Sequence, residues 1–288
     1  MNSSVHLNLD GAWSERPLGM ACVDARTWGP RVRYFAPERL LARFYEEVLT
    51  SLPPFVLCGS GDFHHLAGWL VRRVTTPVTV VSFDNHPDWD VRPPRWACGG
   101  WVNRALELAN VRRVVVWGCG NFELEWPSRL FADRRALREG RLAVHPWAER
   151  LKAKTGERFD AMTRSNWRDR FEAFARELAG TDVYVTIDLD CLVAEEAVTN
   201  WENGMFTADD VAWAVRMLRG GARIIAGDVC GAYSLPRFER FGQRLAGWWD
   251  HPKLDARNVA DARMVNMRAV GRIWRELTEC VPTSTIAQ

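Results

Sequence analysis

The 288-residue sequence lacks several features that would place it in whole classes of protein. No stretch is apolar for long enough to span a bilayer, so we expect no membrane association. The opening MNSSVHLNLDGAW has no basic segment followed by an apolar one, so we expect no secretory signal. The formal net charge of only +2 gives no reason to expect nucleic acid as a partner.

Cysteine pairs are also missing. The seven cysteines are odd in number, scattered, and never spaced as Cys-x-x-Cys: Cys22, Cys58, Cys98, Cys119, Cys191, Cys230 and Cys280. This pattern excludes a Cys-x-x-Cys zinc site and is typical of a reducing compartment, so we expect a cytoplasmic protein.

Short apolar segments alternate with amphipathic helical patterns along the chain. The segments PFVLCGSG, VTVVSFD, RRVVVWGCG, RLAVHPW, DVYVTIDLD and ARIIAGDV predict strands. Because they are apolar at successive positions, they are typical of parallel strands buried on both faces. Helices are predicted at residues 37–52, 65–74, 103–110, 168–179, 207–219 and 255–277, and long excursions at 124–142 and 192–204. We therefore expect a three-layer α/β fold with a mostly parallel sheet, forming one domain over residues 1–288.

Polar residues gather where three predicted strands end. Two of the ends repeat an acid at every second position, and the third carries adjacent histidines: Asp84, His86 and Asp88; Asp188 and Asp190; His64 and His65. The carboxyl ends of parallel strands meet at one edge of a sheet, where ligands bind. One Asp-x-Asp alone is more often a cap or a surface acid, but so many carboxylates in one crevice need cations. Carboxylates with a minority of imidazoles suit manganese, and two such ions activate water for hydrolysis.

These motifs carry a specific resemblance. DNHPD (84–88) matches the Asp-x-His-x-Asp signature of the arginase–agmatinase (ureohydrolase) family, and IDLD (187–190) resembles its Phe-Asp-x-Asp signature. SGDFHHLAG is similar to the family's Gly-Gly-Asp-His-Ser segment, with His64 at the ligand position and His65 replacing the serine. The resemblance covers roughly residues 50–235 and identifies a divergent member with the α/β/α arginase–deacetylase fold.

The resemblance implies two manganese ions per chain. One would be held by His64, Asp84, Asp88 and Asp188, and the other by Asp84, His86, Asp188 and Asp190. Asp84 and Asp188 would bridge the ions, and Asp88 would act in catalysis by accepting a hydrogen bond from the attacking hydroxide. Family members often form homo-oligomers.

Two departures from the family pattern concern the substrate. The family's Asp-x-x-Glu, whose glutamate binds the guanidinium, reads DVCG (228–231) here, so Asp228 is the candidate replacement. Its Ser-Gly-x-x-His reads CGGWVN (98–103), which makes Trp101 and Asn103 candidate substrate-binding residues. Retention of the ligands with loss of these residues resembles peptide arginases, which convert arginine residues in peptides to ornithine and release urea. Trp89, Trp96, Trp101 and Trp126 would then form an aromatic mouth.

Two alternatives stay open. CGAYS (230–234) resembles the stretch that carries the catalytic tyrosine of histone deacetylases, and Tyr233 would then stabilise an oxyanion during amide hydrolysis. A deacetylase-like amidohydrolase is therefore the second hypothesis, and a non-catalytic metal-binding module is the third.

Overall fold

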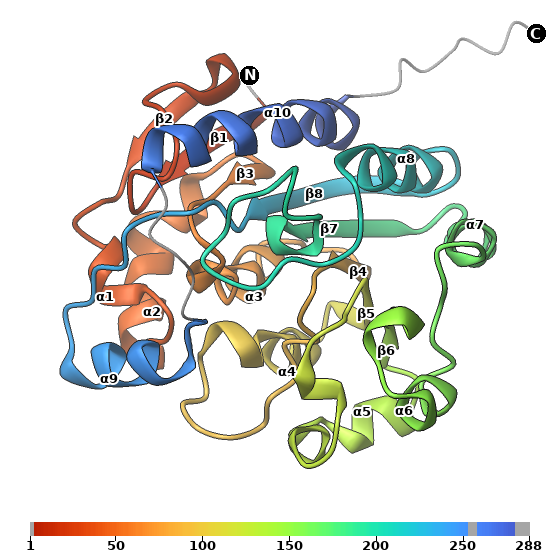
Figure 1. Ribbon diagram of the computed structural model, residues 1–288. Helices are drawn as coiled ribbons and strands as arrows, with labels where there is room; N and C mark the ends of the chain where they lie inside the picture. Colours follow the sequence, from red (N-terminus) through yellow and green to blue (C-terminus); the bar gives the residue numbers. More distant parts are fainter. Residues whose placement is uncertain (1–2, 253–257, 280–288) are drawn as a thin grey trace, which may run out of the picture.

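The computed structural model describes residues 3–252 and 258–279, which contain an eight-stranded sheet. The strand order is β2-β1-β3-β8-β7-β4-β5-β6, and every pairing is parallel. The strands are β1 (Ser4–Asn8), β2 (Ala21–Asp24), β3 (Phe55–Leu57), β4 (Val78–Phe83), β5 (Val111–Trp117), β6 (Leu142–His145), β7 (Asp182–Asp188) and β8 (Arg223–Cys230). The predicted parallel sheet is confirmed (Figure 1).

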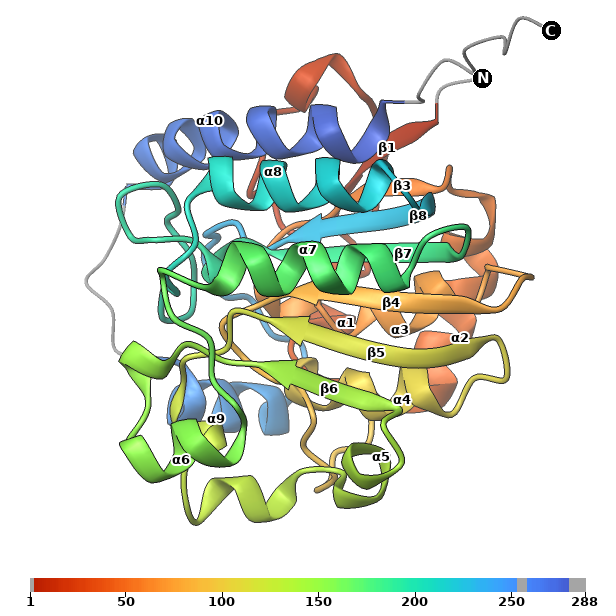
Figure 2. The ribbon, with the colours of Figure 1, turned by 90° about the vertical axis from the view of Figure 1, so that its right-hand side faces the viewer.

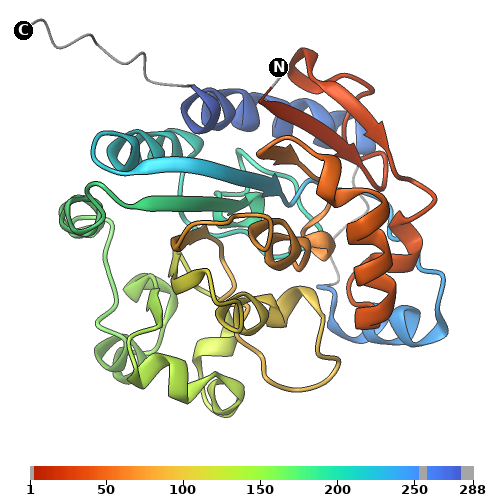
Figure 3. The same cartoon turned by 180° about the vertical axis from the view of Figure 1, so that it is seen from behind.

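Helices cover both faces of this sheet. Figure 2 shows α7, α8 and α10 along one face, and Figure 3 shows α2, α3 and α4 on the other. The helices are α1 (Gly29–Val32), α2 (Glu38–Glu47), α3 (Leu66–Val71), α4 (Trp101–Leu106), α5 (Arg134–Arg138), α6 (Ala153–Arg158), α7 (Trp167–Glu177), α8 (Ala208–Arg219), α9 (Phe241–Asp250) and α10 (Val259–Thr278). The predicted three-layer α/β/α architecture is therefore confirmed.

The double covering explains why the strands are apolar at successive positions. On β4, Val80 packs into the core below α2–α4, whereas its neighbour Val81 packs into the core below α7, α8 and α10. Successive side chains of a strand point to opposite faces, so both must be apolar when both faces are covered. Full burial of each such side chain contributes about 1.5–3 kcal/mol.

Several elements differ from the sequence prediction. β1 and β2 were not predicted, because SVHLN carries polar residues and the edge strand ACVD is short and largely exposed. Helix α9 was not predicted either, since its large apolar side chains face solvent and its sequence holds two glycines. The predicted excursion at 124–142 contains α5.

Two other findings concern the absences noted in the sequence. The six cysteines within residues 3–252 are free thiols, and Cys280 lies outside the described residues. In the described part of the chain, no helix combines the length and hydropathy needed to cross a membrane.

Candidate metal centre

The carboxyl ends of β3, β4 and β7 bring the three polar motifs together. His64 follows the short turn Gly61–Phe63 between β3 and α3, while the other motif residues follow β4 or end β7. All six predicted ligands are at most 9% exposed: His64, Asp84, His86, Asp88, Asp188 and Asp190. β4 and β7 are hydrogen-bonded neighbours in the middle of the sheet, so their acidic ends are adjacent.

The first group of possible metal ligands is His64, Asp84 and Asp88. Nδ1 of His64 lies 3.0 Å from Oδ2 of Asp84 and 3.1 Å from Oδ2 of Asp88. Oδ2 of Asp188 lies 3.7 Å from the same nitrogen. These atoms are close enough to converge on one cation.

The second group is Asp84, His86 and Asp190. Nδ1 of His86 lies 2.9 Å from Oδ2 of Asp190 and 3.5 Å from Oδ1 of Asp84. Asp84 belongs to both groups and presents a different oxygen to each histidine. This arrangement is suited to two neighbouring ions with Asp84 between them.

Hydrogen bonds fix which ring nitrogen of His64 faces the acids. Its Nε2 lies 2.9 Å from Oγ1 of Thr186, and that hydroxyl donates to Oδ1 of Asp228 at 2.9 Å. Thr186 must therefore accept a hydrogen bond from the Nε2–H group of His64, which leaves the lone pair of a neutral ring on Nδ1. Nδ1 of His64 and Oδ2 of Asp84 are buried and have no hydrogen-bond partner within the described part of the chain. A lone pair facing carboxylate oxygens is repulsive, so a cation fits between them.

The pKa values of these groups also indicate that the cluster needs positive charge. Burial raises the pKa of Asp88 to about 7 and of Asp188 to about 8, and neighbouring carboxylates add to both shifts. Burial also raises the pKa of Asp190, to about 7. Burial lowers the pKa of His64, but the adjacent carboxylates of Asp84 and Asp88 favour a protonated ring and raise the pKa overall. The cluster therefore requires positive charge, from protons or from metal ions.

Contacts outside the two groups hold the acids in place. Asp88 has a left-handed backbone with φ of 48°, which aspartate tolerates better than most residues. The indole Nε1–H of Trp101 donates to Oδ2 of Asp88 at 2.6 Å. Nε2 of His86 lies 3.5 Å from Oε2 of Glu202. Such partners orient ligand side chains in metal sites.

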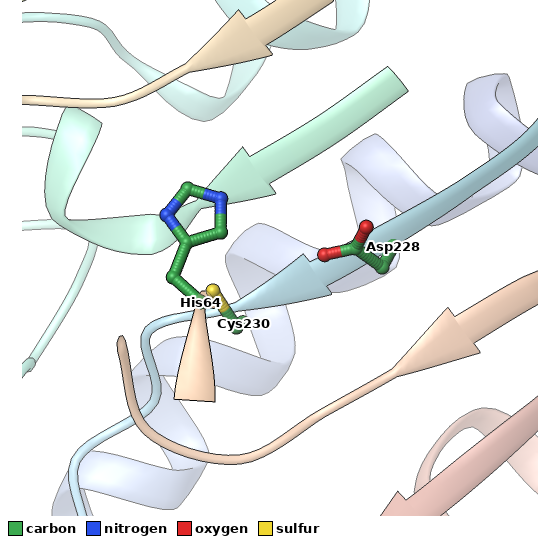
Figure 4. Close-up of side chains that lie close together, drawn as sticks. All are labelled: His64, Asp228 and Cys230. Carbon is green, nitrogen blue, oxygen red and sulfur yellow. The ribbon is translucent and has the colours of Figure 1, made fainter. Parts of the chain in front are cut away.

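A third group, His64, Asp228 and Cys230, lies beside the first (Figure 4). Both oxygens of Asp228 already accept hydrogen bonds, from Tyr184 at 2.5 Å and from Thr186 at 2.9 Å. The thiol of Cys230 donates to Oδ2 of Asp188 at 3.3 Å. We interpret this third group as support for His64 and Asp188 rather than as a separate metal site.

The end of β8 also explains the missing glutamate. In the Asp-x-x-Glu pattern the glutamate position is occupied by Gly231, whose φ is +100°. A Cβ there would lie 2.3 Å from Oδ1 of Asp188, so no side chain fits. Asp228 does not replace it, because in the described structure Asp228 does not line the cavity above the ligands.

That cavity has a volume of about 630 Å³, and all six predicted ligands line it. Its other walls come from residues 89–100, from 122–131, from Trp201 and Glu202, and from α9. Four further carboxylates face it, those of Asp90, Glu123, Glu202 and Asp250. Arg92 is the one lysine or arginine among the described lining residues.

Several predicted substrate residues lie elsewhere. Trp101 and Asn103 are buried behind the wall, where Asn103 donates to the backbone oxygens of Trp89 and Asp90. Tyr233 does not line the cavity within the described residues, nor do Trp96 and Trp126. Trp89 does, and so do the tryptophans that sequence reasoning missed, Trp201 and Trp249. His65 is buried away from the cavity, which favours His64 as the ligand.

Comparisons of the sequence and the structure with known proteins identify the fold. No protein-family model matches the sequence. An uncharacterized protein of Thermotoga maritima is 26% identical over 202 residues, which are 69% of this chain and 66% of that protein, slightly under two thirds of its length. Agmatine ureohydrolase of Thermoplasma volcanium superposes with a TM-score of 0.55 at 15% identity, covering 95% of this chain and 89% of that one. Arginase from Bacillus subtilis superposes with a TM-score of 0.55 at 14% identity, covering 97% and 99%. The chain therefore has the ureohydrolase fold, with a strongly diverged sequence.

Proposed function

We propose that this chain is a divergent ureohydrolase that uses two manganese ions to hydrolyse a guanidino C–N bond. Its substrate would be an arginine side chain within a peptide, and its products peptidyl ornithine and urea. The observation that carries the proposal is the pair of ligand groups sharing Asp84 on an acidic cavity. The carboxylate-rich ligand set, with two imidazoles, supports manganese.

The chemistry divides between the ions and the chain. When bound, two divalent ions activate water and stabilise the charge that develops during its addition. Water adds to the guanidinium carbon, the bond from that carbon to the side-chain nitrogen breaks, and a proton passes to the leaving amine. Asp88 is suited to accept and return that proton, because its carboxylate belongs to the first ligand group and so lies beside the position where the water would be held. Trp101 holds the Asp88 carboxylate in place during both transfers.

The charges of the cavity support a substrate without a free carboxylate. The guanidinium of Arg92 is already paired with Asp90, through hydrogen bonds of 2.6 and 2.9 Å. The α-carboxylate of free arginine would find no unpaired lysine or arginine among the described lining residues and would face several acids, which would attract only the adjacent α-ammonium. An arginine inside a peptide carries neutral amides at the same positions, and the acids then attract only its guanidinium.

Helix α9 supports the peptide proposal independently. Leu245 and Trp249 line the cavity and are also 54% and 82% exposed. They form an apolar rim on which residues flanking the arginine could pack. The deacetylase alternative loses its supporting observation, because Tyr233 does not line the cavity in the described structure.

The decisive assay measures products directly. Manganese-loaded protein is incubated with an arginine peptide, with free arginine and with the matching acetyl-lysine peptide, and urea and acetate are assayed. We expect urea from the arginine peptide, little from free arginine, no acetate, and no activity in Asp84→Ala. Asp169→Ala, at an exposed position on α7, is the matched control and should be fully active. Acetate alone would establish the deacetylase, and metal binding without either product would leave the binding module.

A further inference from the structure

The four additional carboxylates of the cavity differ in their partners. Asp90 pairs with Arg92, and Asp250 accepts a hydrogen bond from the hydroxyl of Tyr34. Glu202 lies beside His86, as described above. Glu123 differs from them, because its Oε2 is buried with no hydrogen-bond partner among the residues that the structure describes.

The position of Glu123 is set by a short turn after β5. Asn121 accepts a hydrogen bond from the Glu123 backbone N–H at 3.2 Å and so begins the turn Phe122–Leu124. Leu124 is fully buried and anchors this turn in the core. A Cβ at Gly99 would lie 3.9 Å from Oε1 of Glu123, so the carboxylate lies within contact range of Gly99, another residue that lines the cavity.

A buried carboxylate oxygen without a partner is costly unless a proton or a ligand satisfies it. Of the neighbouring groups, His86 would favour the ionised Glu123 only as an imidazolium, which a metal-binding imidazole is not, while Asp88, Asp90 and Asp250 are acidic and Arg92 is paired with Asp90. A guanidinium carries five N–H donors in a planar fork that matches a carboxylate. It is therefore the cation best suited to Glu123.

We propose that Glu123 determines specificity by binding the substrate guanidinium while water attacks its carbon. This inference rests on the proposed function. It also gives the site a recognition carboxylate from the β5 side, since Gly231 cannot carry one on the β8 side and Asp228 is fully engaged.

Binding of matched ligands tests the contact without relying on turnover. Calorimetry on the metal-loaded protein compares an arginine peptide with the citrulline peptide, whose ureido group has nearly the same shape but no charge. We expect the wild type to bind the arginine peptide roughly 10–100-fold more tightly, the range for a hydrogen bond to a charged group. Glu123→Gln should reduce this preference to threefold or less while two ions stay bound. Glu46→Gln, on the exposed face of α2, controls for loss of one carboxylate and should keep the preference.

The outcomes separate this inference from the proposed function. If the wild type releases urea and Glu123→Gln keeps both its KM and its arginine preference, Glu123 does not bind the guanidinium although the function stands. If no urea is released but the arginine preference depends on Glu123, the function fails and the recognition site stands. Should Glu123→Gln misfold by circular dichroism, Glu123→Asp serves instead. It should show an intermediate preference, and an undiminished one would refute the proposal.

Discussion

Metal binding should raise the melting temperature of this protein by an amount that depends on which ligand group is intact. A ligand at 100 times its dissociation constant stabilises the folded state by about 2.7 kcal/mol per site. Two sites give about 5 kcal/mol, and at roughly 2–4 °C per kcal/mol the melting temperature should rise by about 10–20 °C. Chelated and manganese-loaded samples of the same protein are compared by calorimetry.

Variants at the two groups turn this into a test of the geometry. Asp84→Ala removes a member of both groups and should abolish the rise, whereas Asp190→Ala affects only the second group. About half of the rise, roughly 5–10 °C, should therefore survive in Asp190→Ala. Asp169→Ala, exposed on α7, should keep all of it. Equal losses in Asp84→Ala and Asp190→Ala would refute two groups that share Asp84, and no rise in the wild type would refute the metal centre.

Three other predictions follow from single contacts or charges. Without metal, the free energy of unfolding should fall as pH rises from about 6.5 to 8 in urea titrations. Asp88, Asp188, Asp190 and Glu123 have pKa values raised to about 7, 8, 7 and 8, so the folded state still holds protons that the unfolded chain has released. Below pH 6.5 this fall is opposed by the lowered pKa values of His6, His65 and His145, and bound manganese should remove the contribution of the three aspartates. Thr186→Val breaks the hydrogen bond to His64 and should weaken manganese binding about 10–100-fold by calorimetry, while unchanged affinity would contradict the orienting role. Trp249→Ala should raise KM for the arginine peptide but not for methylguanidine, whereas Trp248→Ala, exposed but outside the cavity lining, should change neither.

The ligand cluster was predictable from the sequence because the parallel topology brings its motifs together. Parallel strands bring their carboxyl ends to one edge, so Asp84 and Asp188 are close once β4 and β7 are neighbours, although the apolar pattern did not predict that pairing. The expected extended alternation is not what places the acids, because Asp88 has a left-handed backbone and Asp190 lies in the turn Leu189–Cys191. The choice of His64 over His65 needed the family register, since a strand-to-helix turn could present either ring.

The substrate walls could not be predicted in the same way. They come from loops far apart in sequence, such as those holding Glu123 and Glu202, and no periodic pattern relates them. Trp101 and Asn103 lie within the expected stretch, but they support Asp88 and the backbone instead of facing the cavity. A residue pattern shows which part of the fold a segment belongs to. The direction of each side chain depends instead on which groups already fill the space around it.

The limited space beside Asp188 connects the missing glutamate at residue 231 with the proposed role of Glu123. Gly231 adopts a φ of +100° directly against Asp188, and any side chain there would displace the Asp188 carboxylate, which lies 3.7 Å from Nδ1 of His64. A chain with this turn must take its guanidinium-binding carboxylate from another loop or lose guanidinium recognition. Glu123 lies on such a loop, within contact range of Gly99, and its buried oxygen has no hydrogen-bond partner among the described residues. Loops on a fixed set of strands can change in this way without disturbing the ligands. An enzyme that keeps its reaction but changes its substrate is therefore expected to keep its metal ligands and to take its guanidinium-binding carboxylate from a different loop.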